Sequence, residues 1–409
     1  MTQVTESGTA SVPGGTDAGA ITVNQAAEGP GSPRSRAADA RIAPTRSRDP
    51  EAFGAADPRS EEWRFTPLDR LRGLLRGDAA AEGAVHVTID APEVVEVSEV
   101  GLDDPRVGSV LTPGDVVAAH AGSRSGSATV IRIPRGQVVD RPVSVAITGK
   151  GGPDAVGYGH LVVDVEDQAE AVVVLDHTGS AAWAANVELR VGQAAVLTVV
   201  SLQDWEDDAV HSGAHAALVG RDARFKSVVV TLGGDLVRLK PTVRYAGPGG
   251  DAELLGLYFA DAGQHLEHRI VVDHDASNCR SRVTYKGALQ GEGAHTVWFG
   301  DVIIRPDTTG TDTYELNRNL LLTDGARADS VPNLEIETGE VTGAGHASAT
   351  GRFDDEQLFY LQARGIPMEQ ARRLVVRGFF HELLMKIAVP EIRERLEAAI
   401  EAELEAVRA

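Results

Sequence analysis

The chain has 409 residues, of which 42% are hydrophobic and 24% are charged, values typical of a globular protein and not of a collagen-like or wholly disordered chain. Asp and Glu number 60 against 39 Lys and Arg, so the formal net charge at pH 7 is -21. Because binding to phosphate backbones or to anionic membranes depends on Lys and Arg, this charge argues against a nucleic-acid partner and against a membrane partner.

Cys279 is the single cysteine, so the chain forms no internal disulfide and supplies neither a cysteine zinc finger nor a four-cysteine iron–sulfur site. We expect it to be a buried small hydrophobic residue. No apolar run reaches the roughly 18 residues that a membrane helix needs. The first residues combine neither a basic start nor an apolar stretch, so we expect no secretory signal and a cytoplasmic location.

Residues 1–58 contain no Leu, Trp or Tyr and a single Phe, Phe53. Because so little apolar surface cannot offset the entropy lost on ordering, we predict a disordered N-terminal tail over 1–58. A helical segment is predicted over 59–84, where four leucines share one helical face and Gly77 ends the pattern. These leucines are Leu68, Leu71, Leu74 and Leu75.

From residue 85 to residue 352 the apolar pattern changes to the period of two that is typical of β-strands. We find no convincing helix in this region, which excludes alternating strand–helix units and a doubly wound nucleotide-binding fold. Turn-forming segments recur at intervals of roughly 15–33 residues, the range of one coil of a solenoid. Strands and turns alone leave a solenoid, a barrel or a large sandwich open.

A helical pattern returns over 353–409, where apolar residues recur at helical spacing on two segments separated by 365–367. Pro390 ends this pair, and a final helix follows with apolar residues at every fourth position. We therefore predict a C-terminal helical subdomain.

The sequence lacks the phosphate-binding, metal-binding and redox motifs that would indicate an enzyme. Gly149 and Lys150 lack the preceding glycine and the following Ser or Thr of a phosphate-binding loop, and no HExxH or CxxC pair is present. A group of four polar residues, His265, Glu267, His268 and His274, has the composition of a metal site. On a strand, however, the first two face one way and the last two face the other, so we interpret the group as an ordinary polar strand face.

Several segments together are similar to the SufB/SufD family of iron–sulfur cluster assembly proteins. Residues 278–287 resemble the family stretch N-x-x-S-R-x-x-Y-K-G, and residues 332–366 resemble its signature block in order and spacing. Residues 132–143 are similar to its upstream strand motif, and residues 62–68 fit its N-terminal helix. Within the family the chain looks like the SufD type, because His346 stands where SufB-type chains carry a cysteine.

The resemblance implies a mainly β fold, a right-handed parallel β-helix flanked by an N-terminal helical segment and a C-terminal helical subdomain. It implies a non-enzymatic scaffold subunit that pairs with a SufB-like paralogue and docks a SufC-like ABC ATPase. The complex assembles iron–sulfur clusters, so His346 is a candidate ligand of a nascent cluster shared with SufB. Ala344 replaces a cysteine of some relatives, so no thiolate from this chain assists His346. Whether a flavin binds the complex stays open.

The helices after residue 353 carry the residues expected to dock SufC, because they hold more apolar positions than covering the β-region requires. The candidates are Phe359, Tyr360, Leu361, Arg364, Phe379 and Phe380. Two alternatives remain. One is an exported β-helix enzyme that acts on acidic polysaccharide, which the negative charge disfavours. The other is a purely structural SufC anchor, in which His346 has no role in metal binding.

Overall fold

The computed structural model describes residues 45–352, 355–387 and 389–406. Most of the predicted disordered tail lies outside this part of the chain. The remainder of that prediction is wrong, because Pro50–Phe53 form a 3-10 turn (η1) whose N-terminus is capped by the Asp49 carboxylate. The ring of Phe53 packs against the buried cluster formed by the N-terminal segment.

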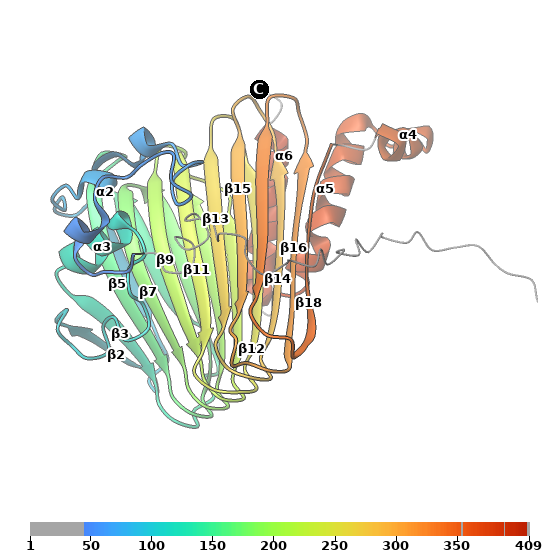
Figure 1. Cartoon of the computed structure of the whole chain (residues 1–409). Coiled ribbons are helices and arrows are strands. Elements are labelled where there is room, and N and C mark those ends of the chain that lie inside the picture. The colour runs from blue at the N-terminus through green and yellow to red at the C-terminus, as the bar shows by residue number, and fades with distance from the viewer. Residues whose placement is uncertain (1–44, 353–354, 388, 407–409) are drawn as a thin grey trace, which may run out of the picture. The chain divides into compact units, whose positions relative to one another are not determined.

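The chain folds into a parallel β-solenoid of about eight turns, as predicted, with two nine-stranded sheets as its walls (Figure 1). We call these sheet A and sheet B. Sheet A contains, in spatial order, β1 (Val85–Asp90), β4 (Val143–Lys150), β6 (Glu170–Ser180), β8 (Val196–Trp205), β10 (Arg224–Thr231), β12 (Asp251–Ala260), β14 (Arg280–Leu289), β16 (Thr311–Leu321) and β18 (Val341–Arg352). Sheet B contains β2 (Glu96–Val100), β3 (Ala128–Ile133), β5 (Val156–Val165), β7 (Ala182–Val191), β9 (Val210–Val219), β11 (Leu236–Tyr245), β13 (His265–His274), β15 (His295–Ile304) and β17 (Arg327–Ile336).

Matching side chains stack from coil to coil in the interior. Val143 lies opposite Val173, which lies opposite Val199, and all three are buried in the main core between the sheets. Neighbouring parallel strands lie about 4.8 Å apart, so such columns bring like residues into contact along the solenoid. The period-two alternation of the sequence therefore sorts side chains into an interior set and an exterior set.

The predicted turns also stack. Gln168, Ala194 and Asp222 all adopt positive φ, and each donates its amide proton to a carbonyl of the next turn at 2.8–3.0 Å. These bonds satisfy backbone groups that the strands leave free, so each coil repeats the geometry of the one before it.

One helix inside the β-region was not predicted. Helix α3 (Val116–Arg124) begins where the Asp115 carboxylate accepts the amide proton of Ala118 at 2.9 Å. Its opening Val-Val pair has the composition of a strand, but the N-cap fixes the first turn and its apolar face is buried. The prediction that residues 85–352 contain no helix is therefore wrong at this segment.

The N-terminal segment lies over the outer side of sheet B. It contains the 3-10 turn η2 (Leu68–Leu71) and helix α2 (Arg72–Arg76), which ends at Gly77 in the left-handed conformation at φ 66°. Trp63, Leu71 and Leu74 are buried there against residues of α3 and sheet B.

Two C-terminal helices cover the outer face of sheet A, as Figure 1 shows beside β14 and β16. They are α5 (Met368–Leu384) and α6 (Pro390–Ala406), and α4 (Asp355–Ala363) precedes them. Phe380 and Leu396 pack on a row of outward-facing apolar residues from β8, β10 and β12. Among the described residues no helix is both long and apolar enough to cross a membrane.

Candidate functional site

The C-terminal end of the solenoid is formed by two edge strands. β18 pairs with β16, and β17 pairs with β15, and in the described part of the chain neither has a strand on its other side. An edge strand presents unpaired backbone N–H and C=O groups, which form a template for another chain. In the described part of the chain, the edges of both sheets are therefore unpaired at this end.

His346 lies in β18, directly opposite Glu315 of β16. Glu315 in turn lies opposite Val283, a core residue, so this register position faces the interior of the solenoid. His346 occupies the same position one layer further on, but its side chain is exposed because no described coil covers it. His346, the predicted cluster ligand, therefore lies at the open end of the solenoid, at a position of β18 that faces the interior.

Glu315 beneath it is an unusual carboxyl group that the sequence did not reveal. It is 1% exposed, and neither carboxyl oxygen has a hydrogen-bond partner among the described residues. Burial, together with the nearby charge of Asp301, raises the pKa of Glu315 to about 8. Gly300 on the facing strand makes room for it, because a Cβ there would lie 2.7 Å from the Glu315 Oε2 atom.

Polar groups continue along the interior at this end. The Tyr258 hydroxyl donates to the Asn319 Oδ1 atom at 2.6 Å, and Asn319 donates to the Thr350 hydroxyl of the last coil at 3.3 Å. Asn317 accepts from the Ser330 hydroxyl at 2.6 Å. These bonds join β12, β16, β17 and β18, so the interior becomes polar toward the open end.

The histidines of β13 lie on two opposite faces of the strand, as predicted, and the side chains on both faces are buried. His265 and Glu267 lie on the outer face, with the His265 Nε2 atom 3.2 Å from a Glu267 oxygen. His268 and His274 point into the core and are completely buried, so the prediction of a polar strand face is wrong for them. Burial lowers the pKa of His268 to about 3 and that of His274 to about 4. They hydrogen-bond the hydroxyls of Thr231 and Ser281 at 2.9 and 3.0 Å.

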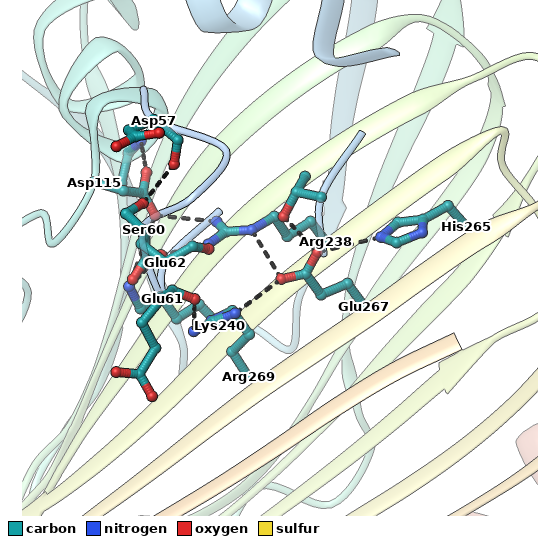
Figure 2. A network of polar contacts seen from close by, with 12 residues as sticks. Asp57, Ser60, Glu61, Glu62, Asp115, Arg238, Lys240, His265, Glu267 and Arg269 are labelled. Carbon is teal, nitrogen blue, oxygen red and sulfur yellow. Dashed lines mark hydrogen bonds and ion pairs between the residues drawn. The ribbon is translucent and has the colours of Figure 1, made fainter. Parts of the chain in front are cut away.

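A buried network of charges joins the N-terminal segment to sheet B (Figure 2). Its centre is Arg238, 1% exposed, which forms ion pairs with Glu62, with Asp115 at 3.1 Å and with Glu267 at 3.4 Å. The Trp63 ring lies 4.3 Å from the Arg238 guanidinium carbon.

The network is completed by two further cations, Lys240 and Arg269, which contact Glu62 at 2.8 Å and Glu267 at 3.2 Å. Burial favours the neutral form of Glu62, but the charges of Lys240, Arg238 and Arg269 outweigh it and lower the pKa of that carboxyl to about 2. Three carboxylates meet three cations, so the network is balanced. The network attaches the N-terminal segment to the solenoid. Neither here nor elsewhere in the described residues do three or more potential metal ligands converge.

The six predicted docking residues separate into an exposed set and a buried one. On α4, Phe359 and Tyr360 are 72% and 55% exposed, and the Arg364 guanidinium lies over the Tyr360 ring at 4.4 Å. Leu361 beside them is half-buried. On α5, Phe380 is fully buried against sheet A, so its assignment as a docking residue is wrong.

Phe379 is half-buried and packs against the same cluster, with the Lys286 ammonium 5.4 Å from its ring centre. Phe379 and Phe380 on α5 therefore both contribute to covering sheet A, and the exposed aromatic residues are Phe359 and Tyr360 on α4.

Cys279 is buried, as predicted, and burial raises the pKa of its thiol.

These features define a β-solenoid with an open, histidine-bearing end and a helical C-terminal cover. Residues 146–379 match the family model described as the SufBD core domain of SUF system FeS cluster assembly. The chain is 60% identical to an iron–sulfur cluster assembly SufBD family protein of Mycobacterium bovis, over 87% of this chain and 91% of that relative. It is 27% identical to the iron–sulfur cluster assembly protein SufD of Escherichia coli, over 85% of this chain and 89% of the relative. The chain therefore belongs to the SufB/SufD family of iron–sulfur cluster assembly proteins.

Proposed function

We propose that this protein is the SufD-like scaffold subunit of a cytoplasmic complex that assembles iron–sulfur clusters, without catalytic activity of its own. The observation that carries the proposal is the position of His346, exposed on an edge strand at the open end of the solenoid. The similarity to a relative named SufD supports the assignment to this branch of the family.

The partner at the open end is a SufB-like paralogue. The edges of β17 and β18 lie at the same end, and a chain of the same fold has matching sheets to extend both. A cluster assembled at this junction would be cargo of the complex, held by the His346 imidazole on one side and by thiolates of the paralogue on the other. Imidazole replaces thiolate on some irons of natural clusters, so the chemistry is suitable.

The second partner, a SufC-like ATPase, docks on α4. Phe359 and Tyr360 form an exposed aromatic surface that contributes nothing to the described core. Exposed aromatic side chains of this kind are typical centres of protein interfaces. The α4 surface is preferred to the apolar cluster of α5 and α6 that includes Phe380 and Leu396, because that cluster is already buried against sheet A.

The test is co-expression of this chain with the paralogue and the ATPase, followed by purification of the complex and measurement of bound iron and sulfide. His346→Ala should leave the three-subunit complex intact and lower cluster formation. His86→Ala is the matched control, because His86 is also exposed on a terminal strand but at the other end of the solenoid. Normal cluster formation in His346→Ala would favour the alternative of a purely structural anchor.

A second pair of variants tests the docking surface. Phe359→Ala with Tyr360→Ala should lower capture of the ATPase while leaving pairing with the paralogue unchanged. Val138→Ala, an apolar residue that is 67% exposed outside the C-terminal helices, should change neither. Deleting all residues after 353 is not a suitable test, because it would also expose the apolar outer face of sheet A.

A further inference from the structure

The buried Glu315 carboxyl has no structural task in the described part of the chain. Both of its oxygens lack a hydrogen-bond partner, although the side chain is 1% exposed. A buried polar group without a partner costs about 1–3 kcal/mol, so a structural role would be better served by an apolar residue. The nearby Asp301 carboxyl, by contrast, accepts a hydrogen bond from the Asn333 amide at 2.6 Å.

The position of Glu315 relates it to the open end. It faces the interior in register with His346, so the two side chains belong to adjacent layers about 4.8 Å apart. Gly300 opposite leaves the space that the carboxyl group occupies. The rings of Tyr285 and Trp298 are also buried in this interior, with their centres 6.4 Å apart. Neither the Tyr285 hydroxyl nor the Trp298 indole nitrogen has a hydrogen-bond partner among the described residues.

We propose that Glu315 is a second iron ligand at the open end, which binds a ferrous ion together with His346. This inference rests on the proposed function, because it takes His346 as the first ligand. Carboxylate oxygen and imidazole nitrogen are both suitable donors for Fe²⁺, with bonds of about 2.0–2.2 Å in comparable sites. Two ligands bound to one ion are therefore at most about 4.4 Å apart, which the spacing of adjacent layers permits after small side-chain rotations.

The two donors make an incomplete site. No third His, Cys, Asp or Glu of the described residues converges with them, so water or the paralogue supplies the remaining ligands. The exposure of His346 leaves the ion accessible from the side on which the paralogue binds. The site thus holds iron at the subunit junction before sulfide arrives. Because Glu315 is buried, the ion lies closer to the interior of the solenoid than it would on the exposed His346 alone.

The experiment measures ferrous ion bound by the complex of this chain with its paralogue, under anaerobic conditions and without sulfide, in competition with a chromophoric chelator. Glu315→Gln should weaken Fe²⁺ binding roughly tenfold or more, as should His346→Ala. Glu335→Gln is the matched control, because Glu335 is an exposed carboxylate on the edge strand β17 and the chemical change is the same. It should leave binding unchanged.

Glu315→Asp provides a second variant, which keeps the acid but withdraws its oxygens by one methylene, and it should also weaken binding. Fe²⁺ binding at the wild-type level in both Glu315 variants would overturn the inference. If His346→Ala lowers cluster formation while the Glu315 variants bind iron normally, the proposed function stands and only the second ligand is wrong. If His346→Ala forms clusters normally, the proposed function itself fails.

Discussion

Removing the Arg238 charge should detach the N-terminal segment from the solenoid. In Arg238→Met the side chain keeps most of its length and apolar contact, but Glu62, Asp115 and Glu267 lose their shared cation. Arg238 is 1% exposed and Glu267 is fully buried, so water cannot replace the lost interactions. Removing one partner from a buried ion pair costs about 3–5 kcal/mol. The stacking contact of Arg238 with Trp63 is lost as well.

The assay is hydrogen exchange of the amides in residues 61–76, because this segment is held by the network. A loss of about 3–5 kcal/mol corresponds to exchange that is faster by roughly two to four orders of magnitude. The control is Arg221→Met, which removes a cation whose partner, Asp222, is exposed like itself (64% and 61%), where a loss of at most about 1 kcal/mol is expected. Equal exchange in the two variants would refute the role assigned to the network.

Four further predictions follow from particular contacts. Because the pKa of Glu62 in the folded protein is about 2, below its usual 4.5, its stabilisation is complete above about pH 4.5 and is lost as the pH falls toward 2. Protection of 61–76 from exchange should decrease across this window. Glu62→Gln should make the decrease smaller without removing it, because the pKa of Glu267 in the same network is also lowered. Gly300→Ala should lower the melting temperature, because its Cβ would lie 2.3 Å from the Trp298 ring. Glu315→Gln should raise the melting temperature of the isolated chain more at pH 7 than at pH 5, because the wild-type carboxyl must hold a proton that the unfolded chain releases. An equal effect at both pH values would contradict the raised pKa of Glu315. Phe359→Ala should leave the melting temperature unchanged, because the ring is 72% exposed, and a large loss would show that α4 is part of the core.

The fold class was predictable because its signals are local. Period-two alternation, regularly spaced turns and the family motifs each depend on neighbouring residues, and together they indicate a β-solenoid. Helix α3 was missed because its first two residues are β-branched, and the capping by Asp115 that decides its structure is a contact of one side chain.

The buried sites were less predictable because their partners are remote in sequence. Arg238 meets Glu62 across 176 positions and Asp115 across 123, so no motif marks it. Period two placed His268 and His274 on one face correctly, but it could not show that this face is the interior. Nor could the sequence show that Glu315 is buried, because the space for its carboxyl group depends on Gly300 on the facing strand. By contrast, His346 could be found by resemblance, because the surrounding small residues belong to a contiguous motif.

The central claim is that His346 holds part of a nascent cluster at the junction with the paralogue. The direct measurement is iron and acid-labile sulfide in the purified three-subunit complex, with wild-type, His346→Ala and His86→Ala chains compared at equal subunit ratios. We expect His346→Ala to assemble with both partners and to contain markedly less iron and sulfide than the wild type and His86→Ala. Iron and sulfide equal to the wild type in an intact His346→Ala complex would contradict the claim.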